Sequence, residues 1–146
     1  MSNAPSSTVS VAQAVIHHAA AIRVIQAALA KAEGLGIKVC VSVVDSAGTL
    51  AGFARMPGAF LISGDIATKK AHAAVSIGVP ADLVEQALSQ EAPRVREGIV
   101  QTGFMMIRGS FPLRAGEALI GAVGVSGGSE AQDVECAQAG VAALLA

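Results

Sequence analysis

The sequence is poor in aromatic residues and in charge. It has no tryptophan or tyrosine, four phenylalanines and 14% charged residues, whereas about 25% of the residues in a typical soluble protein are charged. A net charge of −1 provides no basic surface for phosphates, and few rings are present on which bases could stack. We therefore expect no nucleic-acid partner.

Long apolar runs and cysteine motifs are also missing. Gly, His or Arg interrupts each apolar stretch well short of the ~20 residues that span a membrane. Met1–Thr8 are polar, unlike a secretory signal. Cys40 and Cys136 match no zinc or redox spacing and fit a reducing compartment. We therefore expect a cytoplasmic protein with no membrane partner.

Small aliphatic residues are abundant instead. Hydrophobic residues make up 53% of the chain, and the mean hydropathy is +0.59. With so little charge, part of the monomer surface has to be apolar and covered by other subunits. The composition therefore predicts a homo-oligomer.

The order of the expected elements predicts an α+β fold, an antiparallel sheet sandwiched by helices in a single domain. Residues 1–9 are expected to be flexible, and residues 10–146 to form the domain. Ser10, with Gln13 three residues later, predicts a capping box at the start of the first helix. The expected helices cover 10–34 or 10–36, 62–77, 80–91 and 129–145, and the expected strands cover 38–45, 49–55, 104–107 and 118–125. Residues 108–112 are expected to form a loop. The pattern of residues 91–103 indicates neither a helix nor a strand.

A histidine completes the apolar stripe of the first expected helix. The stripe, in steps of four and three, is Val11, Val15, His18, Ile22, Ile25, Leu29 and Ala32. An imidazole on such a face suits haem iron or another metal. The alternative is a core or interface histidine hydrogen-bonded to backbone. His17 points about 100° away and is the second candidate ligand.

Lys70 is the second candidate residue. It shares a line with Ile66, Ala73 and Ile77 on the second long helix, so its stem should cross apolar surface. The lysine then either reaches water or pairs with a carboxylate, or it meets an anion or a carbonyl group of a ligand in a pocket.

The other candidates are a group of charged residues and a glycine-rich turn. The charged residues are Arg55, Glu91, Arg94, Arg96 and Glu97. They could clamp the carboxylates of a ligand or form the rim of a subunit interface. Ser126, Gly127 and Gly128 stand between a strand and a helix, where backbone N–H groups attract anions. A tight turn followed by a helix cap explains the same residues.

The chain resembles, in order and spacing, the GlcG/HbpS family of haem-binding proteins. The residues that carry this resemblance are VSVVDSAGTLAGFARMPGA, DIATKKAHAAVSIGVP and FPLRAGEALIGAVGVSGGSEAQDVECAQAG. The family also supplies the C-terminal domain of PduO-type corrinoid adenosyltransferases, and the similarity runs from about residue 10 to residue 145. It implies a profilin-like sandwich, oligomers as large as hexamers or octamers, and haem bound near subunit surfaces in some members.

This resemblance leads to two functional hypotheses. In the first, the oligomer binds haem, with His18 or His17 as the axial ligand and Lys70, Arg55 or the turn at 126–129 receiving the propionates. In the alternative, the protein is a small hydrolase, deaminase or tautomerase that acts on an enol, enamine or muconate-like acid from aromatic catabolism. Its carboxylate holders would be Arg55, Arg94 and Arg96, and its proton carriers Lys70, Glu91 or His18. A non-catalytic partner subunit is a third alternative.

Overall fold

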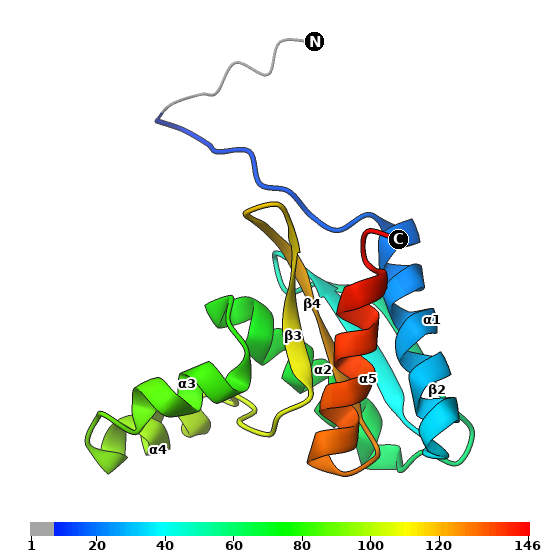
Figure 1. The fold of residues 1–146 in the computed structure, drawn as a ribbon. Helices are drawn as coiled ribbons and strands as arrows, with labels where there is room; N and C mark the ends of the chain where they lie inside the picture. Colours follow the sequence, from blue (N-terminus) through cyan, green and yellow to red (C-terminus); the bar gives the residue numbers. More distant parts are fainter. Residues whose placement is uncertain (1–7) are drawn as a thin grey trace.

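A computed structural model describes residues 8–146 and contains one antiparallel sheet with helices on both faces (Figure 1). The four strands lie in the order β2-β1-β4-β3. Their bounds are β1 Cys40–Asp45, β2 Leu50–Arg55, β3 Ser110–Ala115 and β4 Ala118–Ser126. The helices are α1 His18–Leu35, α2 Leu61–Ile77, α3 Ala81–Leu88, α4 Pro93–Gln101 and α5 Glu130–Ala143. The predicted α+β sandwich is confirmed.

The two central strands are covered on both faces. Helices α1 and α5 lie side by side on one face, and α2 covers the other (Figure 1). On β1, Val41 and Val43 belong to the core cluster beneath α1 and α5, whereas Val44 packs against the alanines of α2. Successive side chains of β1 therefore pack into two separate cores, one on each face of the sheet.

Small residues bring α2 close to the sheet. A Cβ atom added to Gly124 on β4 would overlap the backbone carbonyl of Ala67 and lie 2.6 Å from the amide nitrogen of Ala71. Ala67 and Ala71 are themselves fully buried. The alanine-rich composition is thus used inside the monomer, where it allows helix and sheet backbones to approach.

The first helix begins later than its capping signal predicts. Helix α1 starts at His18, and the expected helical residues from Ser10 onward are not helical. Ile16 is buried, and its N–H donates to the carbonyl of Ile120 on β4. Val15 stays more than half exposed, so the stripe upstream of the helix has no core to pack against. The hydrogen bond between Ile16 and Ile120 thus prevails over the capping box that Ser10 and Gln13 predict. The residues expected to be flexible, 1–9, lie mostly outside the described part of the chain.

The third strand was also predicted in the wrong place. Residues 104–107 are irregular, and β3 instead covers residues expected to form a loop. Pro112 lies within β3 and removes a backbone donor. Because β3 lies at the edge of the sheet and pairs only with β4, one side of the strand needs no partner and the proline is tolerated.

Helices α3 and α4 form an arm that projects past β3 (Figure 1). Helix α3 falls within the helix expected at 80–91, whereas α4 occupies a segment whose conformation the pattern did not predict. No residue of α4 is buried. Every residue of the helix is therefore at least partly accessible to solvent, to ligands or to other chains.

Candidate functional site

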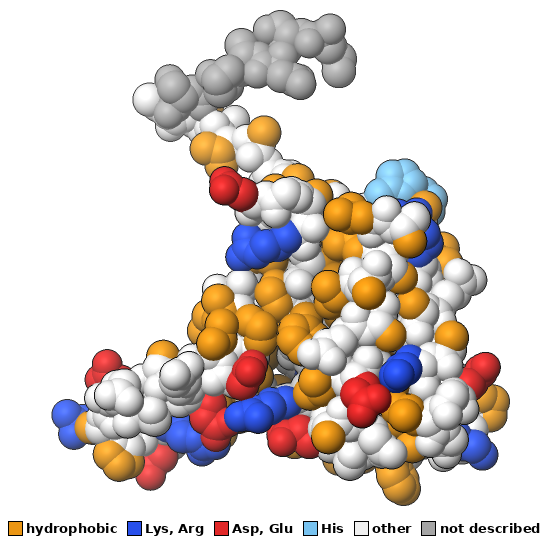
Figure 2. Space-filling view, viewed as in Figure 1, with side chains coloured by type: hydrophobic (Ala, Val, Ile, Leu, Met, Phe, Trp, Pro, Cys, Tyr) orange, Lys and Arg blue, Asp and Glu red, His pale blue; other side chains and the backbone are white. Residues whose placement is uncertain are grey.

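The two histidines lie at the N-terminal end of α1. His17 is the N-cap, and its Nδ1 accepts a hydrogen bond of 3.0 Å from the amide of Ala19. The His17 and His18 rings are tilted against each other, with centroids 4.2 Å apart. Histidine surface is visible beside the start of α1 in Figure 2. The capping bond satisfies one of the amides that every helix start leaves without an intrahelical partner.

This capping bond makes the two histidines differ as possible metal ligands. Since Nδ1 of His17 accepts, the neutral ring carries its proton on Nε2. Ligation through Nε2 would move that proton to Nδ1 and break the cap, because a metal-bound imidazole normally donates its other N–H. The side chain of His18 makes no hydrogen bond to another residue in 8–146. The His18 imidazole is therefore the one of the two that could ligate a metal without breaking the helix cap.

The predicted burial of His18 is wrong. The buried stripe of α1 is Ala21, Val24, Ile25, Ala28 and Ala32, and His18 is exposed. Val15 and Ile22, at 55% and 50% exposure, flank it along the chain, one on either side. Arg23 follows, and its guanidinium donates to the carbonyl of Leu144 at 3.0 Å. The sequence pattern placed His18 inside because it extended the helix through Val11 and Val15.

Lys70 is buried in an ion pair. Its Nζ donates to Asp133 Oδ2 at 3.1 Å and to the carbonyl oxygen of Val125 at 2.8 Å. Both side chains are almost fully inaccessible. Burial lowers the pKa of Lys70 and raises the pKa of Asp133, because desolvation disfavours both charges more than their mutual attraction favours them. Of the alternatives for Lys70, the structure shows pairing with a carboxylate.

The glycine-rich turn is tied into the same network. The N–H of Gly128 donates to Asp133 Oδ1 at 2.9 Å, and the N–H of Ser129 donates to Gln132 within a complete capping box. Gly127 has φ +147°, and an added Cβ atom would overlap the carbonyl of Lys38. Of the two explanations for Ser126, Gly127 and Gly128, the structure therefore shows the turn with a helix cap. The amides of Gly128 and Ser129 are already engaged.

The predicted haem residues do not converge in one chain. His18 lies next to Ile16, which pairs with Ile120 on β4, whereas Lys70 contacts Val125 at the other end of that strand. Five residue steps of extended strand, from Ile120 to Val125, separate these positions by about 17 Å. Ser126 and Arg55 both pair with Cys40, so they also lie at the end away from His18.

The charged residues are likewise divided. Arg55 lies on edge strand β2 and donates to the carbonyl of Ala59. Glu91 and Arg96 share a groove between α3 and α4, on the arm beyond the opposite edge of the sheet (Figure 1). One chain thus does not assemble the carboxylate clamp of Arg55, Arg94 and Arg96 that the enzymatic alternative requires.

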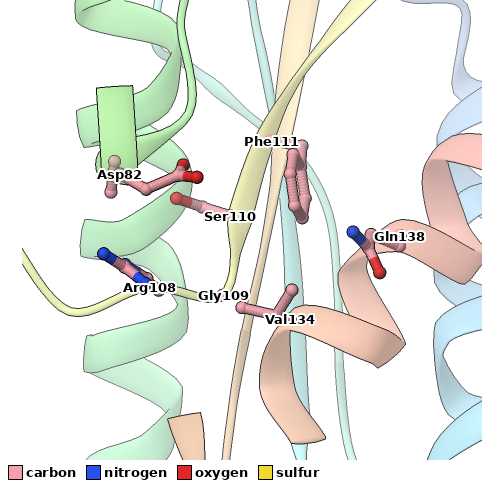
Figure 3. Close-up of a pocket in the computed structure, with 8 residues that line it drawn as sticks. Asp82, Arg108, Gly109, Ser110, Phe111, Val134 and Gln138 are labelled. Carbon is pink, nitrogen blue, oxygen red and sulfur yellow. The ribbon is translucent and has the colours of Figure 1, made fainter. Parts of the chain in front are cut away.

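Sequence reasoning missed a small pocket between α3, β3 and α5 (Figure 3). Its volume is about 150 Å³, and Ser110, Asp82, Phe111 and Gln138 contribute to its lining. In Figure 3 the Ser110 hydroxyl and the Asp82 carboxylate point toward each other. Hydrophobic side chains gather in the hollow between the arm and α5, above a charged rim (Figure 2). No pattern could join these residues, because they come from three separate elements.

These features define a small sheet-and-helix domain with an exposed histidine and no metal cluster of three or more ligands among residues 8–146. Residues 16–142 match the family model described as haem degrading protein HbpS-like. The chain belongs to this family, as its resemblance predicted.

Individual relatives agree with this membership. Corrinoid adenosyltransferase PduO from Salmonella typhimurium is 35% identical over 120 residues, which cover 82% of this chain but 36% of that protein. The chain thus spans about a third of the length of PduO. Among solved structures, Klebsiella pneumoniae ORFY matches with a TM-score of 0.86 at 32% identity, covering 94% of this chain and 96% of that one. A PduOC:haem complex matches with a TM-score of 0.80 at 32% identity, covering 88% and 94%.

Proposed function

We propose that this protein binds haem on its surface, with His18 as the axial ligand. The observation that carries the proposal is the state of the His18 imidazole, which is exposed and makes no hydrogen bond within 8–146, while the neighbouring His17 is engaged as a helix cap. The related PduOC:haem complex, at 32% identity, supports the choice of ligand.

The residues around His18 fit a haem group. Bound haem would supply an iron that can accept a nitrogen of the His18 imidazole. Ile22 lies one turn further along α1 and Val15 shortly precedes His18 in the chain, so both offer exposed aliphatic surface near it. His17 fixes the start of α1 and so holds the backbone of His18 in place. These groups form a surface rather than a closed pocket, so a second subunit is needed to cover more of the haem.

Titration with haemin tests this assignment. His18→Ala should abolish the Soret shift that the wild-type protein produces, or weaken binding at least tenfold. His72→Ala is the matched control, because His72 is an exposed histidine on α2, and it should bind as the wild type does. His17→Ala should keep the Soret shift and lose helix stability. A Soret shift that survives in His18→Ala would contradict the proposal.

We also propose that the subunits form a homo-oligomer, a hexamer or an octamer. Phe60, Leu61 and Ile62 at the start of α2 are 68%, 90% and 65% exposed. Three consecutive large apolar side chains in water are typical of a subunit contact. A second copy is the occupant we expect, because a low-charge surface of this kind is typical of homo-oligomer interfaces.

Leu61→Asp should reduce the size of the assembly, because the new carboxylate would be desolvated at the contact. Light scattering coupled to size-exclusion chromatography measures the mass. Gln90→Asp, a change of equal charge at an exposed position in the α3–α4 connection, should leave the mass unchanged. A monomeric wild-type protein would overturn this proposal.

We also propose that the protein is located in the cytoplasm, which is a reducing compartment. Cys40 and Cys136 are buried and unpaired, and burial raises the pKa of Cys136 to about 11. Both thiols therefore stay protonated at neutral pH. No helix within residues 8–146 combines the length and the apolar character needed to cross a membrane.

A further inference from the structure

A groove on the arm combines positive charge with an apolar floor. It lies between α2, α4 and the connection from α4 to β3, and its volume is about 360 Å³. Lys69 and Arg96 contribute the charge, while Val100, Phe104, Met105, Met106 and Ile107 contribute the apolar surface. No acidic residue lines it. Arg96 also lines the neighbouring groove between α3 and α4, which differs in that Glu85 and Glu91 line it.

The two cations are available to a ligand. Arg96 has no carboxylate within 4.0 Å among residues 8–146. Lys69 pairs with Asp65 at 3.0 Å, but both side chains are more than half exposed. Such a surface pair contributes little energy, so Lys69 can exchange its partner for a ligand carboxylate. A guanidinium and an ammonium group that line the same groove favour an anion.

The apolar floor indicates the rest of the ligand. Thioethers such as those of Met105 and Met106 make favourable contacts with aromatic rings, and Phe104 can pack against a ring. Val100 and Ile107 remain more than 40% exposed, so a bound ring would cover surface that is now in water. A cavity of about 150 Å³ holds benzene, and this groove is more than twice as large. It has room for a ring with a short side chain.

We propose that this groove binds an aromatic or conjugated monocarboxylic acid of about 10–14 non-hydrogen atoms, with the carboxylate between Lys69 and Arg96 and the ring on Met105 and Met106. The site is distinct from His18, because the arm and the start of α1 lie on opposite sides of the sheet (Figure 1). The proposal does not depend on haem binding.

Calorimetric titration of the full chain with trans-cinnamate tests the site. Arg96→Gln should weaken binding at least tenfold, because a charge-assisted hydrogen bond is lost. Arg94→Gln is the matched control, since it removes the same charge from the same helix but Arg94 does not line the groove. Asp65→Asn should tighten binding, because it frees Lys69. Cinnamamide, which has the same ring and no charge, should bind at least tenfold more weakly than cinnamate.

Three results would overturn the proposal: no cinnamate binding at millimolar concentration, equal effects of Arg94→Gln and Arg96→Gln, or equal affinity for cinnamate and cinnamamide. Circular dichroism of each variant shows whether it has folded. His18→Ala should leave cinnamate binding unchanged, so failure of the haem proposal and failure of this one give different results.

Discussion

Lys70→Met is expected to destabilise the protein by about 3–5 kcal/mol, the usual cost of breaking a buried ion pair by removing one partner. The methionine fills similar space, so most of the loss comes from the Asp133 carboxylate, which is left buried without its cation. The carbonyl of Val125 loses a donor as well. Urea denaturation followed by circular dichroism measures the change in the free energy of unfolding.

Adding Asp133→Asn should recover part of this loss. The asparagine removes the unpaired charge and keeps an oxygen that can accept from the N–H of Gly128. The double variant Lys70→Met/Asp133→Asn should therefore be more stable than Lys70→Met alone. If the two sites were independent, the second substitution would instead add its own loss of stability to the first. A double variant whose loss equals the sum of both single losses would contradict the ion-pair account.

The Lys70→Met variant should also depend on pH in a defined direction. Burial already raises the pKa of Asp133 in the presence of Lys70, and removing the cation raises it further. A raised pKa means that the folded state holds the proton more tightly than the unfolded state does. Stability is thus gained as pH falls through the raised folded pKa, and lost again as pH rises. Lowering the pH from 7 toward 5 should stabilise Lys70→Met relative to the wild type.

Gly124→Ala is expected to be the second large loss, about 3 kcal/mol, at the upper end of overpacking effects. The added methyl group would overlap the carbonyl of Ala67 and approach the amide of Ala71. Both are backbone atoms of α2, so no side chain can rotate away. The helix would have to move off the sheet and leave voids along β4. Thermal and urea denaturation report the loss.

Gly98→Ala is the matched control for this prediction. Gly98 lies within α4, and an added Cβ atom would meet nothing within 4 Å. Because alanine is the better helix former, this variant should gain about 0.5–1 kcal/mol. Equal losses in both variants would show that the collision with α2 is not the cause.

Much of the fold could be predicted from local pattern. The strand expected at 38–45 is β1, and the helix expected from Ser129 is α5, which Ser129 caps. Gly36 and Gly78, both with φ above +60°, end α1 and α2 where the sequence placed their stops. These signals succeed because the interactions behind them join residues close together in the chain.

The candidate site could be predicted less well. His18 was identified as a ligand on the assumption that it is buried, and it is exposed. Lys70 was correctly placed on apolar surface, but its partner Asp133 is 63 residues away, and no spacing indicates the pair. The sequence does not distinguish Arg94 from Arg96 as a carboxylate ligand, and only the path of residues 103–107 forms the apolar groove that Arg96 lines.

The sequence by itself determined the α+β class, the family and most helix ends, because periodicity, glycine stops and capping residues act over a few positions. The scarcity of aromatic residues and charge also limited the expected partners. Tertiary structure alone decided where α1 begins, since the pairing of Ile16 with Ile120 prevails over the cap at Ser10. It also decided that His18 and Lys70 lie at opposite ends of β4. Burial and long-range pairing depend on which elements meet, and that information is not local.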